Sequence, residues 1–281
     1  MTRASGVVVA TYNIRAAIGP GEPFPAAWWR HVDRSRLERI GSIIGELEAD
    51  VVSLQEVAVM TVDGELIDMP AELGALTGLV PRYAAVAGFP ILDPADGRAI
   101  GACLWGNAIL SRLPIRRSET QGLPIAADDD LIEPDGADHP LAGIAYADAP
   151  VGARERRCLL RVEVDGPTGP IAVVLTHLTH VGSGQRRLQA DALARSLEAQ
   201  PGPAVVAGDL NAAIEAPELA SLGGALTDAF SVAGIPPGDP QRASCGSSRI
   251  DHLLARGLRP VAIAVRRRES AGASDHDPVV A

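Results

Sequence analysis

The chain has 281 residues, of which 47% are hydrophobic and 3% aromatic, so it is long enough to bury a sizeable aliphatic core. Its formal net charge of −10 weighs against a protein that grips duplex DNA mainly through the phosphates, although it leaves room for a local basic groove. The three cysteines contain no CxxC pair, which excludes that type of zinc motif and gives no support to a disulfide framework.

The first quarter of the chain predicts alternating buried strands and amphipathic helices. An apolar run predicts a strand over Val7–Ile14, and a second run predicts one over Val51–Gln55. Between them, Asp33 is a suitable N-cap for a helix that continues to about residue 48, because apolar residues recur after it at helical spacing. A further helix is predicted over residues 69–79, where a proline stands in the first turn.

The middle of the chain predicts two strands and then a long loop. Ile100–Leu104 and Ala108–Leu110 are expected to be strands on either side of a bend at Gly106-Asn107. Residues 121–153 are rich in Asp, Pro, Gly and Ala and have no periodicity, which is typical of a long loop insertion. Such an insertion is either a solvated surface loop or a lid over a binding site.

The second half of the chain predicts more strands than helices. A helix is expected over Gln185–Gln200. Strands are expected over residues 157–164, 171–175, 204–207, 250–254 and 261–265. Because strands often follow one another in pairs, with helices between some of them, we predict an α/β (α+β) protein with mixed sheets rather than a purely parallel sheet.

The apolar runs of the chain are too short to form a signal peptide or a membrane-spanning helix, which bears on the location of the protein. The run that follows Met1–Gly6 is too short for the hydrophobic region of a signal peptide. No apolar run in the chain approaches the length of a membrane-spanning helix. We therefore expect a cytoplasmic protein. Because no break in composition suggests two autonomous domains, residues 1–281 are expected to form a single domain, and we expect a monomer.

Two polar residues stand where predicted strands end. Glu56 follows the strand 51–55, and its carboxylate is a hard oxygen ligand suited to magnesium or manganese. Asn13 ends the first apolar run and offers a neutral oxygen and two donors. Either residue on its own is more simply a solvated surface residue, so the hypothesis depends on several such endings meeting at one edge of the sheets.

A second pair of polar residues follows the strand 204–207. Asp209 and Asn211 are two positions apart, so in extended backbone both side chains point to one side, with Leu210 buried between them. The pair offers an acceptor for a water proton and a donor for an oxyanion; the alternative is an ordinary β-turn. His177 ends the strand 171–175 in the same way and has a donor for a phosphoryl oxygen.

The C-terminal residues supply an acid and an imidazole. Asp251 lies within a buried run, where an unpaired carboxylate is costly, so it requires a charged partner. His276 is the natural partner, because an Asp–His pair sets the tautomer of the ring and raises its basicity. Asp275, next to it, is then free to face a cation.

Taken in order, these segments resemble the endonuclease/exonuclease/phosphatase superfamily of deoxyribonuclease-like, metal-dependent phosphoesterases. The likeness extends from Val7 to Val280. It is carried by Thr11-Tyr12-Asn13-Ile14-Arg15, Leu54-Gln55-Glu56-Val57, Gly106-Asn107-Ala108-Ile109-Leu110-Ser111-Arg112, Thr176-His177-Leu178, Gly208-Asp209-Leu210-Asn211-Ala212, Ile250-Asp251-His252 and Ser274-Asp275-His276-Asp277-Pro278.

The resemblance implies a fold and a cofactor. The fold is a four-layer sandwich, in which two mixed β-sheets pack face to face and are flanked by helices. The cofactor is Mg²⁺ or Mn²⁺, and the resemblance makes Glu56 the main metal ligand, with Asn13 and Asp275 close to the ion. The implied reaction is hydrolysis of a phosphoester by in-line attack of water, with the metal neutralising the developing charge.

The resemblance also assigns roles to the remaining candidates. Asp209 orients or deprotonates the attacking water, while His276, paired with Asp251, is the general acid/base or a donor to the transition state. The residues that hold the substrate are His177, Asn107 and Asn211.

Three features depart from the family pattern. His252 stands where many relatives have an aromatic residue, which would leave that wall of the site polar. The insertion 121–153 contains no matching motif, and such insertions usually set substrate choice in this family. Because the chain ends at Ala281, a final strand after His276 is expected to be short unless the chain is clipped.

Three functions follow from these residues. The favoured one is a hydrolase of small-molecule or lipid-headgroup phosphodiesters or phosphomonoesters, because the acidic charge disfavours nucleic acid as a partner. The alternative is a DNA endonuclease or repair nuclease, which requires a basic groove built from arginines such as Arg156, Arg157 and Arg186. A non-catalytic binding module of the same fold would have lost an essential position, and each position named above is present.

Overall fold

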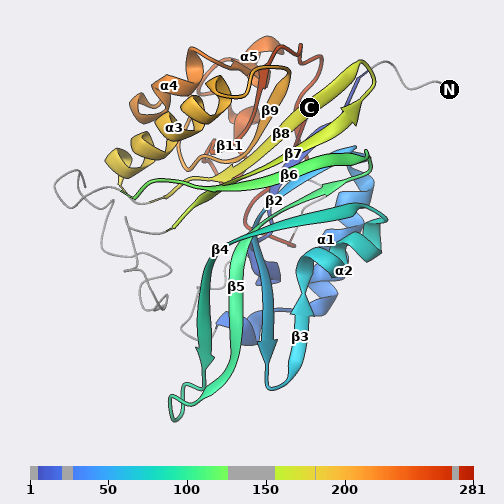
Figure 1. Ribbon diagram of the computed structural model, residues 1–281, viewed down its shortest axis with the longest axis vertical. Coiled ribbons are helices and arrows are strands. Elements are labelled where there is room, and N and C mark those ends of the chain that lie inside the picture. The colour runs from blue at the N-terminus through green and yellow to red at the C-terminus, as the bar shows by residue number, and fades with distance from the viewer. Residues whose placement is uncertain (1–5, 21–27, 126–155, 181, 268–271) are drawn as a thin grey trace.

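The computed structural model describes residues 6–20, 28–125, 156–180, 182–267 and 272–281. Most of the predicted insertion, residues 126–153, lies outside the described residues. The described strands form a seven-stranded and a six-stranded sheet (Figure 1). Among the described residues, none of the helices combines the length and apolarity needed to cross a membrane.

The first sheet has the strand order β12-β13-β1-β2-β5-β4, with β3 paired to β2. Its strands are β1 (Val9–Asn13), β2 (Val51–Val62), β3 (Glu65–Asp68), β4 (Val80–Leu92), β5 (Ala99–Ser111), β12 (Ala264–Val265) and β13 (Val279–Val280). Only β1 and β2 run parallel among these pairs, so the sheet is mixed, as predicted.

The second sheet has the order β10-β11-β9-β8-β7-β6 and is also mixed, since β8 and β9 are parallel and the other pairs antiparallel. Its strands are β6 (Ile115–Gly122), β7 (Cys158–Gly166), β8 (Gly169–His177), β9 (Ala204–Asp209), β10 (Thr227–Asp228) and β11 (Asp251–Arg256).

Helices cover the outer face of each sheet. The α-helices are α1 (Arg34–Glu46), α2 (Met69–Thr77), α3 (Ser183–Glu198), α4 (Ala220–Gly223) and α5 (Ala229–Val232). Short 3-10 turns are η1 (Arg15–Ala17), η2 (Trp28–His31), η4 (Pro217–Leu219) and η5 (Pro240–Arg242). Figure 1 shows α1 and α2 against the first sheet, and α3 and α4 outside the second. The predicted four-layer sandwich is confirmed.

Strand alternation sorts the side chains into three apolar layers. In β9, Ala204 and Val206 pack in the cluster that contains α3, whereas Val205 and Ala207 pack between the sheets. In β1 the same alternation places Val9 between the sheets, whereas Ala10 and Tyr12 lie in the cluster that contains α1. Every second residue of the central strands therefore faces the opposite sheet.

The helix ends follow local sequence rules. Asp33 is the N-cap of α1, and its carboxylate accepts a hydrogen bond of 2.8 Å from the Ser35 amide, as the sequence predicts. Asp68 caps α2 in the same way, and Gly78 ends this helix in the left-handed conformation that favours glycine. The predicted helix 185–200 begins slightly earlier than expected, at Ser183.

Three strand predictions were wrong. The strand predicted to end at Gln55 continues to Val62 through a register shift between Leu54 and Val57. No bend interrupts β5 at Gly106-Asn107; a Cβ at Gly106 would lie 2.0 Å from the Ala84 carbonyl oxygen, so the glycine permits close backbone approach. The strand predicted over 261–265 shrinks to β12, which pairs with the equally short β13.

The strands that sequence reasoning missed include those at two sheet edges. β4 contains Pro81 and Pro90 and has no strict alternation, and prolines are tolerated there because one side of an edge strand needs no hydrogen-bond donors. β6 is the edge of the second sheet and is mostly exposed and polar, so it lacks the apolar run that marks a buried strand.

Replacing Gly208 with alanine is expected to destabilise the second sheet. A Cβ at this position would lie 1.9 Å from the Thr176 carbonyl oxygen of the paired strand, so the backbones would have to separate. We expect the free energy of unfolding, measured by urea denaturation, to fall by about 3 kcal/mol. The control Gly223→Ala adds a Cβ with no atom within 4 Å and should leave the urea midpoint nearly unchanged. Equal midpoints for both variants would contradict this account of Gly208.

Candidate active site

The candidate residues lie at one end of the layer between the sheets. Along β9, the inward series Val205, Ala207 continues to Asp209, and along β8 the inward series ends at His177. Asp251 begins β11 on the same inward face and pairs directly with Asp209 across the ladder. Asn13 ends the inward series of β1. The apolar layer therefore gives way to a polar rim where these strands end or begin.

Asn13 joins the two sheets at this rim. Its Nδ2 donates to Glu56 Oε1 at 2.9 Å and to Asp209 Oδ2 at 3.2 Å, and its Oδ1 accepts from the Arg15 amide at 3.1 Å. Asn13 is 1% exposed, so both carboxylates are held by a buried donor. Two residues 153 positions apart, Glu56 and Asp209, thus share one amide group.

A β-bulge aims Glu56 at this rim. Unbroken alternation would place Glu56 on the same face as Leu54, which packs in the cluster of α1. The register shift between Leu54 and Val57, with φ of 56° at Glu56, turns the carboxylate toward Asn13 instead. The prediction that Glu56 stands where a strand ends is therefore wrong, because β2 continues to Val62, and it is the bulge that brings the carboxylate to Asn13.

Asp251 and His276 form the predicted acid–imidazole pair. His276 Nδ1 lies 2.8 Å from Asp251 Oδ2, and both residues are buried. Ser244 Oγ donates to the same Asp251 oxygen at 2.6 Å. Burial opposes protonation of the ring, but the Asp251 charge and hydrogen bond outweigh it, so the pKa of His276 is raised well above its usual value. The pair therefore favours an imidazolium with Nε2 directed to the rim.

Asp209 lies between two imidazoles. Its Oδ2 is 3.5 Å from His177 Nε2 and 3.8 Å from His276 Nε2. Burial, and then repulsion by Asp251, raises the pKa of Asp209 to about 7, although the His276 charge and hydrogen bonds act in the opposite sense. Burial and the nearby Arg157 hold the pKa of His177 well below its usual range, so this ring is neutral at pH 7. Asp209 is thus a buried carboxyl group with a raised pKa that faces both imidazoles.

Glu56 and Asp275 form the carboxylate side of the rim. Burial, followed by repulsion from Asp275, raises the pKa of Glu56, while the hydrogen bond from Asn13 lowers it. The Asp275 carboxylate forms an ion pair with Arg15 at 3.3 Å. Two carboxylates that repel each other are a donor set that suits a hard divalent cation.

The two predicted substrate-binding amides are placed differently. Asn211 adopts φ of 52° and donates its backbone N–H to Asp209 Oδ1 at 2.9 Å, while its Nδ2 donates to the Leu178 carbonyl oxygen at 2.9 Å. It therefore adjoins the rim. Asn107 is buried on β5, where its Nδ2 faces the Cys158 thiol at 4.0 Å. The structure brings Asn211 to Asp209, whereas the side chain of Asn107 contacts Cys158 and, among the described residues, no carboxylate of the rim.

Sequence reasoning missed residues that hold the site in place. Ser274 Oγ donates to the Asn13 carbonyl oxygen at 2.8 Å, which ties the C-terminal segment to β1. Arg15 is two positions from Asn13 in the sequence, and Ser274 is next to Asp275. Because both lie within the motif segments, this closeness in sequence could have marked them as neighbours of the site. Ser244 lies outside every motif segment, and its role depends on the tertiary fold alone.

His252 lies on the face of β11 opposite to Asp251. Its Nε2 contacts the Ala212 carbonyl oxygen at 2.9 Å, and the ring is buried. The expectation that this histidine makes one wall of the site polar is therefore wrong, because strand alternation turns its ring away from the inward face that carries Asp251.

Comparisons with known proteins identify the family and the fold. A family model described as the Endonuclease/Exonuclease/phosphatase family matches residues 10–276. No match was found among curated proteins. The chain is similar to the crystal structure of an endonuclease/exonuclease/phosphatase from Beutenbergia cavernae, with 24% identity, a TM-score of 0.66 and coverage of 98% of this chain and 70% of that one.

Two further solved structures have the same fold. One is a functionally unknown conserved protein from Enterococcus faecalis, with 18% identity, a TM-score of 0.64 and coverage of 97% of both chains. The other is TDP2 from Caenorhabditis elegans, with 17% identity, a TM-score of 0.61 and coverage of 98% of this chain and 74% of that one. At these identities the likeness concerns the fold, whereas the family model spans nearly the whole chain; this protein belongs to the endonuclease/exonuclease/phosphatase family.

Proposed function

We propose that the protein is a divalent-metal-dependent hydrolase of small-molecule or lipid-headgroup phosphoesters, acting through one catalytic domain. The observation that carries the proposal is the convergence at one rim of two carboxylates, Glu56 and Asp209, with the Asp251–His276 pair. In-line hydrolysis of a phosphoester needs a cation, a proton acceptor for water and a donor to the phosphoryl or leaving oxygen.

Glu56 is the proposed main ligand of Mg²⁺ or Mn²⁺, with Asn13 and Asp275 close to the ion. The donor set supports this choice, because the repulsion between Glu56 and Asp275 that raises the pKa of Glu56 is relieved by a cation. When bound, such an ion polarises a phosphoryl oxygen and neutralises charge that develops in the transition state.

Asp209 is the proposed acceptor of the water proton. Its raised pKa, about 7, matches an acceptor that works near neutral pH. His276 is the proposed proton donor, and Asp251 fixes the tautomer by accepting from Nδ1, which leaves Nε2–H to point at the reacting group. The distance of 3.8 Å between His276 Nε2 and Asp209 Oδ2 supports this assignment, because one phosphate can reach both groups.

His177 and Asn211 are the proposed ligands of the phosphoryl oxygens. His177 is neutral, so it supplies a hydrogen bond without a fixed charge, and Asn211 is positioned next to Asp209. Asn107 remains a candidate for substrate binding, and its buried position on β5 favours an indirect contribution through neighbouring residues.

Two of the three arginines named as groove candidates are buried, which favours a small substrate over a DNA backbone, while Arg156 is exposed. Arg186, one of those expected to form a basic groove, is buried and paired with Glu218 at 3.0 Å, while it also donates to the carbonyl oxygens of Thr179 and His180. Arg157 is buried as well. Guanidinium groups engaged inside the protein contribute little to phosphate contacts along a duplex.

The test is hydrolysis of bis-p-nitrophenyl phosphate and p-nitrophenyl phosphate with Mg²⁺ or Mn²⁺ present. We expect turnover of at least one of them, abolished by EDTA and restored by excess metal, because the carboxylate side of the rim needs a cation. A panel of nucleotides, inositol phosphates and phospholipid headgroups then identifies the leaving group. Absence of turnover on every substrate would favour a binding module.

A plasmid-nicking assay separates the alternative function. Nicking at low enzyme concentration, stronger than turnover of every small substrate and lost in Asp209→Asn, would replace the proposed substrate class with DNA. We expect nicking to be weak, since a chain with a net charge of −10 gains little from the phosphates of DNA.

A further inference from the structure

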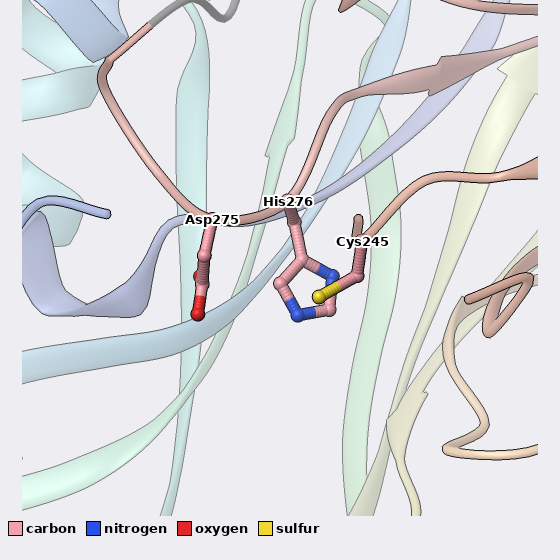
Figure 2. Close-up of side chains that lie close together, drawn as sticks. All are labelled: Cys245, Asp275 and His276. Carbon is pink, nitrogen blue, oxygen red and sulfur yellow. The ribbon is translucent and has the colours of Figure 1, made fainter. Parts of the chain in front are cut away.

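Cys245 lies beside His276 and Asp275 at the rim (Figure 2). Figure 2 shows the thiol next to the imidazole, with the Asp275 carboxylate on the same side of the segment. One ligand atom from each of the three residues, a sulfur, a nitrogen and a carboxylate oxygen, lies within 4.8 Å of the other two. The proposed reaction uses no thiol, so this cluster has chemistry that the hydrolytic function leaves unexplained.

We propose that Cys245, His276 and Asp275 form an inhibitory site for a thiophilic divalent cation such as Zn²⁺. Thiolate, imidazole and carboxylate are the ligands that zinc takes in proteins, with water completing the tetrahedron. A thiolate is a poor ligand for Mg²⁺, which prefers oxygen donors such as those around Glu56. The ligand types therefore distinguish this ion from the activating one.

The Asp251–His276 hydrogen bond prepares the imidazole to bind an ion. Asp251 Oδ2 accepts from Nδ1 at 2.8 Å, which leaves the Nε2 lone pair available after loss of a proton. A histidine that donates one ring N–H to a carboxylate while its other nitrogen binds the metal is the usual arrangement of zinc sites. Ser244 holds the outer carboxylate in place through its 2.6 Å hydrogen bond.

The backbone holds the ligands near one another. Cys245 and His276 form an antiparallel bridge, and the Asp277 amide donates to the Ser244 carbonyl oxygen at 2.6 Å. Zinc–sulfur and zinc–nitrogen bonds of about 2.3 and 2.0 Å require ligand atoms roughly 3.5 Å apart in a tetrahedron. The ligand atoms lie within 4.8 Å of one another, so they must move closer to bind one ion. Rotation of the Asp275 side chain, which is 38% exposed, allows this movement.

Occupation of this site would stop the proposed reaction. The ion takes the nitrogen of His276 that would donate to the substrate, and it draws Asp275 away from the activating metal. Inhibition rests on the proposed function, whereas binding of the ion does not, because the three ligands are present whether or not the rim hydrolyses phosphoesters.

Cadmium binding tests the site without any substrate. Titration of metal-free protein with Cd²⁺ should produce the thiolate-to-cadmium charge-transfer band in the ultraviolet, saturating at one ion per chain, and Zn²⁺ should remove it. The band should disappear in Cys245→Ser and persist in Cys103→Ala, because Cys103 is 1% exposed and its thiol pKa is raised to about 12 by burial. Absence of the band in the wild-type protein, or its persistence in Cys245→Ser, would overturn the site.

Zinc inhibition tests the consequence. At fixed Mg²⁺, the Zn²⁺ concentration that halves each protein's own activity should rise at least about tenfold in Cys245→Ser, the equivalent of one lost ligand of modest strength. Unchanged inhibition together with loss of the cadmium band would overturn the inhibitory role. A cadmium band in a protein that hydrolyses no phosphoester would support the ion site and contradict the proposed function alone.

Discussion

Replacing Glu56 with glutamine is expected to lower kcat/KM by about 10³-fold at a fixed Mg²⁺ concentration, equivalent to about 4 kcal/mol of transition-state stabilisation. Glutamine keeps the shape of the side chain and an oxygen for the Asn13 hydrogen bond, so the loss reports the missing charge. The Mg²⁺ concentration required for half-maximal activity should rise in parallel.

Thermal unfolding gives a second readout for Glu56. The pKa of Glu56 is raised in the folded protein, so the ionised form costs stability at neutral pH, and the neutral Glu56→Gln side chain should raise the melting temperature without metal. Mg²⁺ should stabilise the wild-type protein and leave this variant nearly unaffected. A purely structural role for Glu56 predicts the opposite sign in metal-free buffer.

Glu65→Gln is the matched control, because Glu65 lies on the neighbouring β3 and its side chain is 68% exposed. It should keep wild-type activity and Mg²⁺ dependence. If Glu56→Gln retains activity within about tenfold of the wild-type protein, Glu56 is not the main metal ligand.

His276→Gln is expected to reduce kcat/KM by about 10³-fold, within the usual range for removal of a general acid or base. The amide of glutamine can still donate to Asp251 but has no titratable proton to transfer. Steady-state rates on bis-p-nitrophenyl phosphate measure the effect, and circular dichroism checks that the variant is folded. His31→Gln, at an exposed position, should have wild-type activity.

A double variant separates pairing from mere proximity. If Asp251 acts by orienting His276, then Asp251→Asn combined with His276→Gln should be little worse than His276→Gln alone, because residues that act as a unit are not additive. Fully multiplicative losses would show that Asp251 acts independently of the imidazole. Loss of less than tenfold in His276→Gln would remove His276 from the proposed chemistry.

Much of the site could be predicted because buried strands and their polar endings are local features. The runs before Asn13, His177 and Asp209 are apolar for several residues, and each polar residue ends its run on the inward face of the strand. Strand alternation therefore specified which side chains face the opposite sheet before the sheets were placed. The requirement that buried Asp251 have a partner pointed correctly to His276.

Other features depend on contacts that the chain makes far from its own segment. The bulge that turns Glu56 toward Asn13 arises where β2 pairs with β5, and periodicity within β2 alone would place the carboxylate on the helix side. The edge strand β4 was missed for a related reason. Its prolines argue against a central strand, and only its position at the edge of the sheet makes them acceptable.

The amino-acid sequence by itself determined the family, the mixed four-layer architecture and most of the polar residues at the rim, because these depend on hydrophobic runs and on the residues that end them. The tertiary structure alone decided that Asn13 bridges Glu56 to Asp209 and that Cys245 adjoins His276. These contacts join segments separated by tens to nearly two hundred positions, and their geometry follows from sheet packing and register rather than from any local pattern.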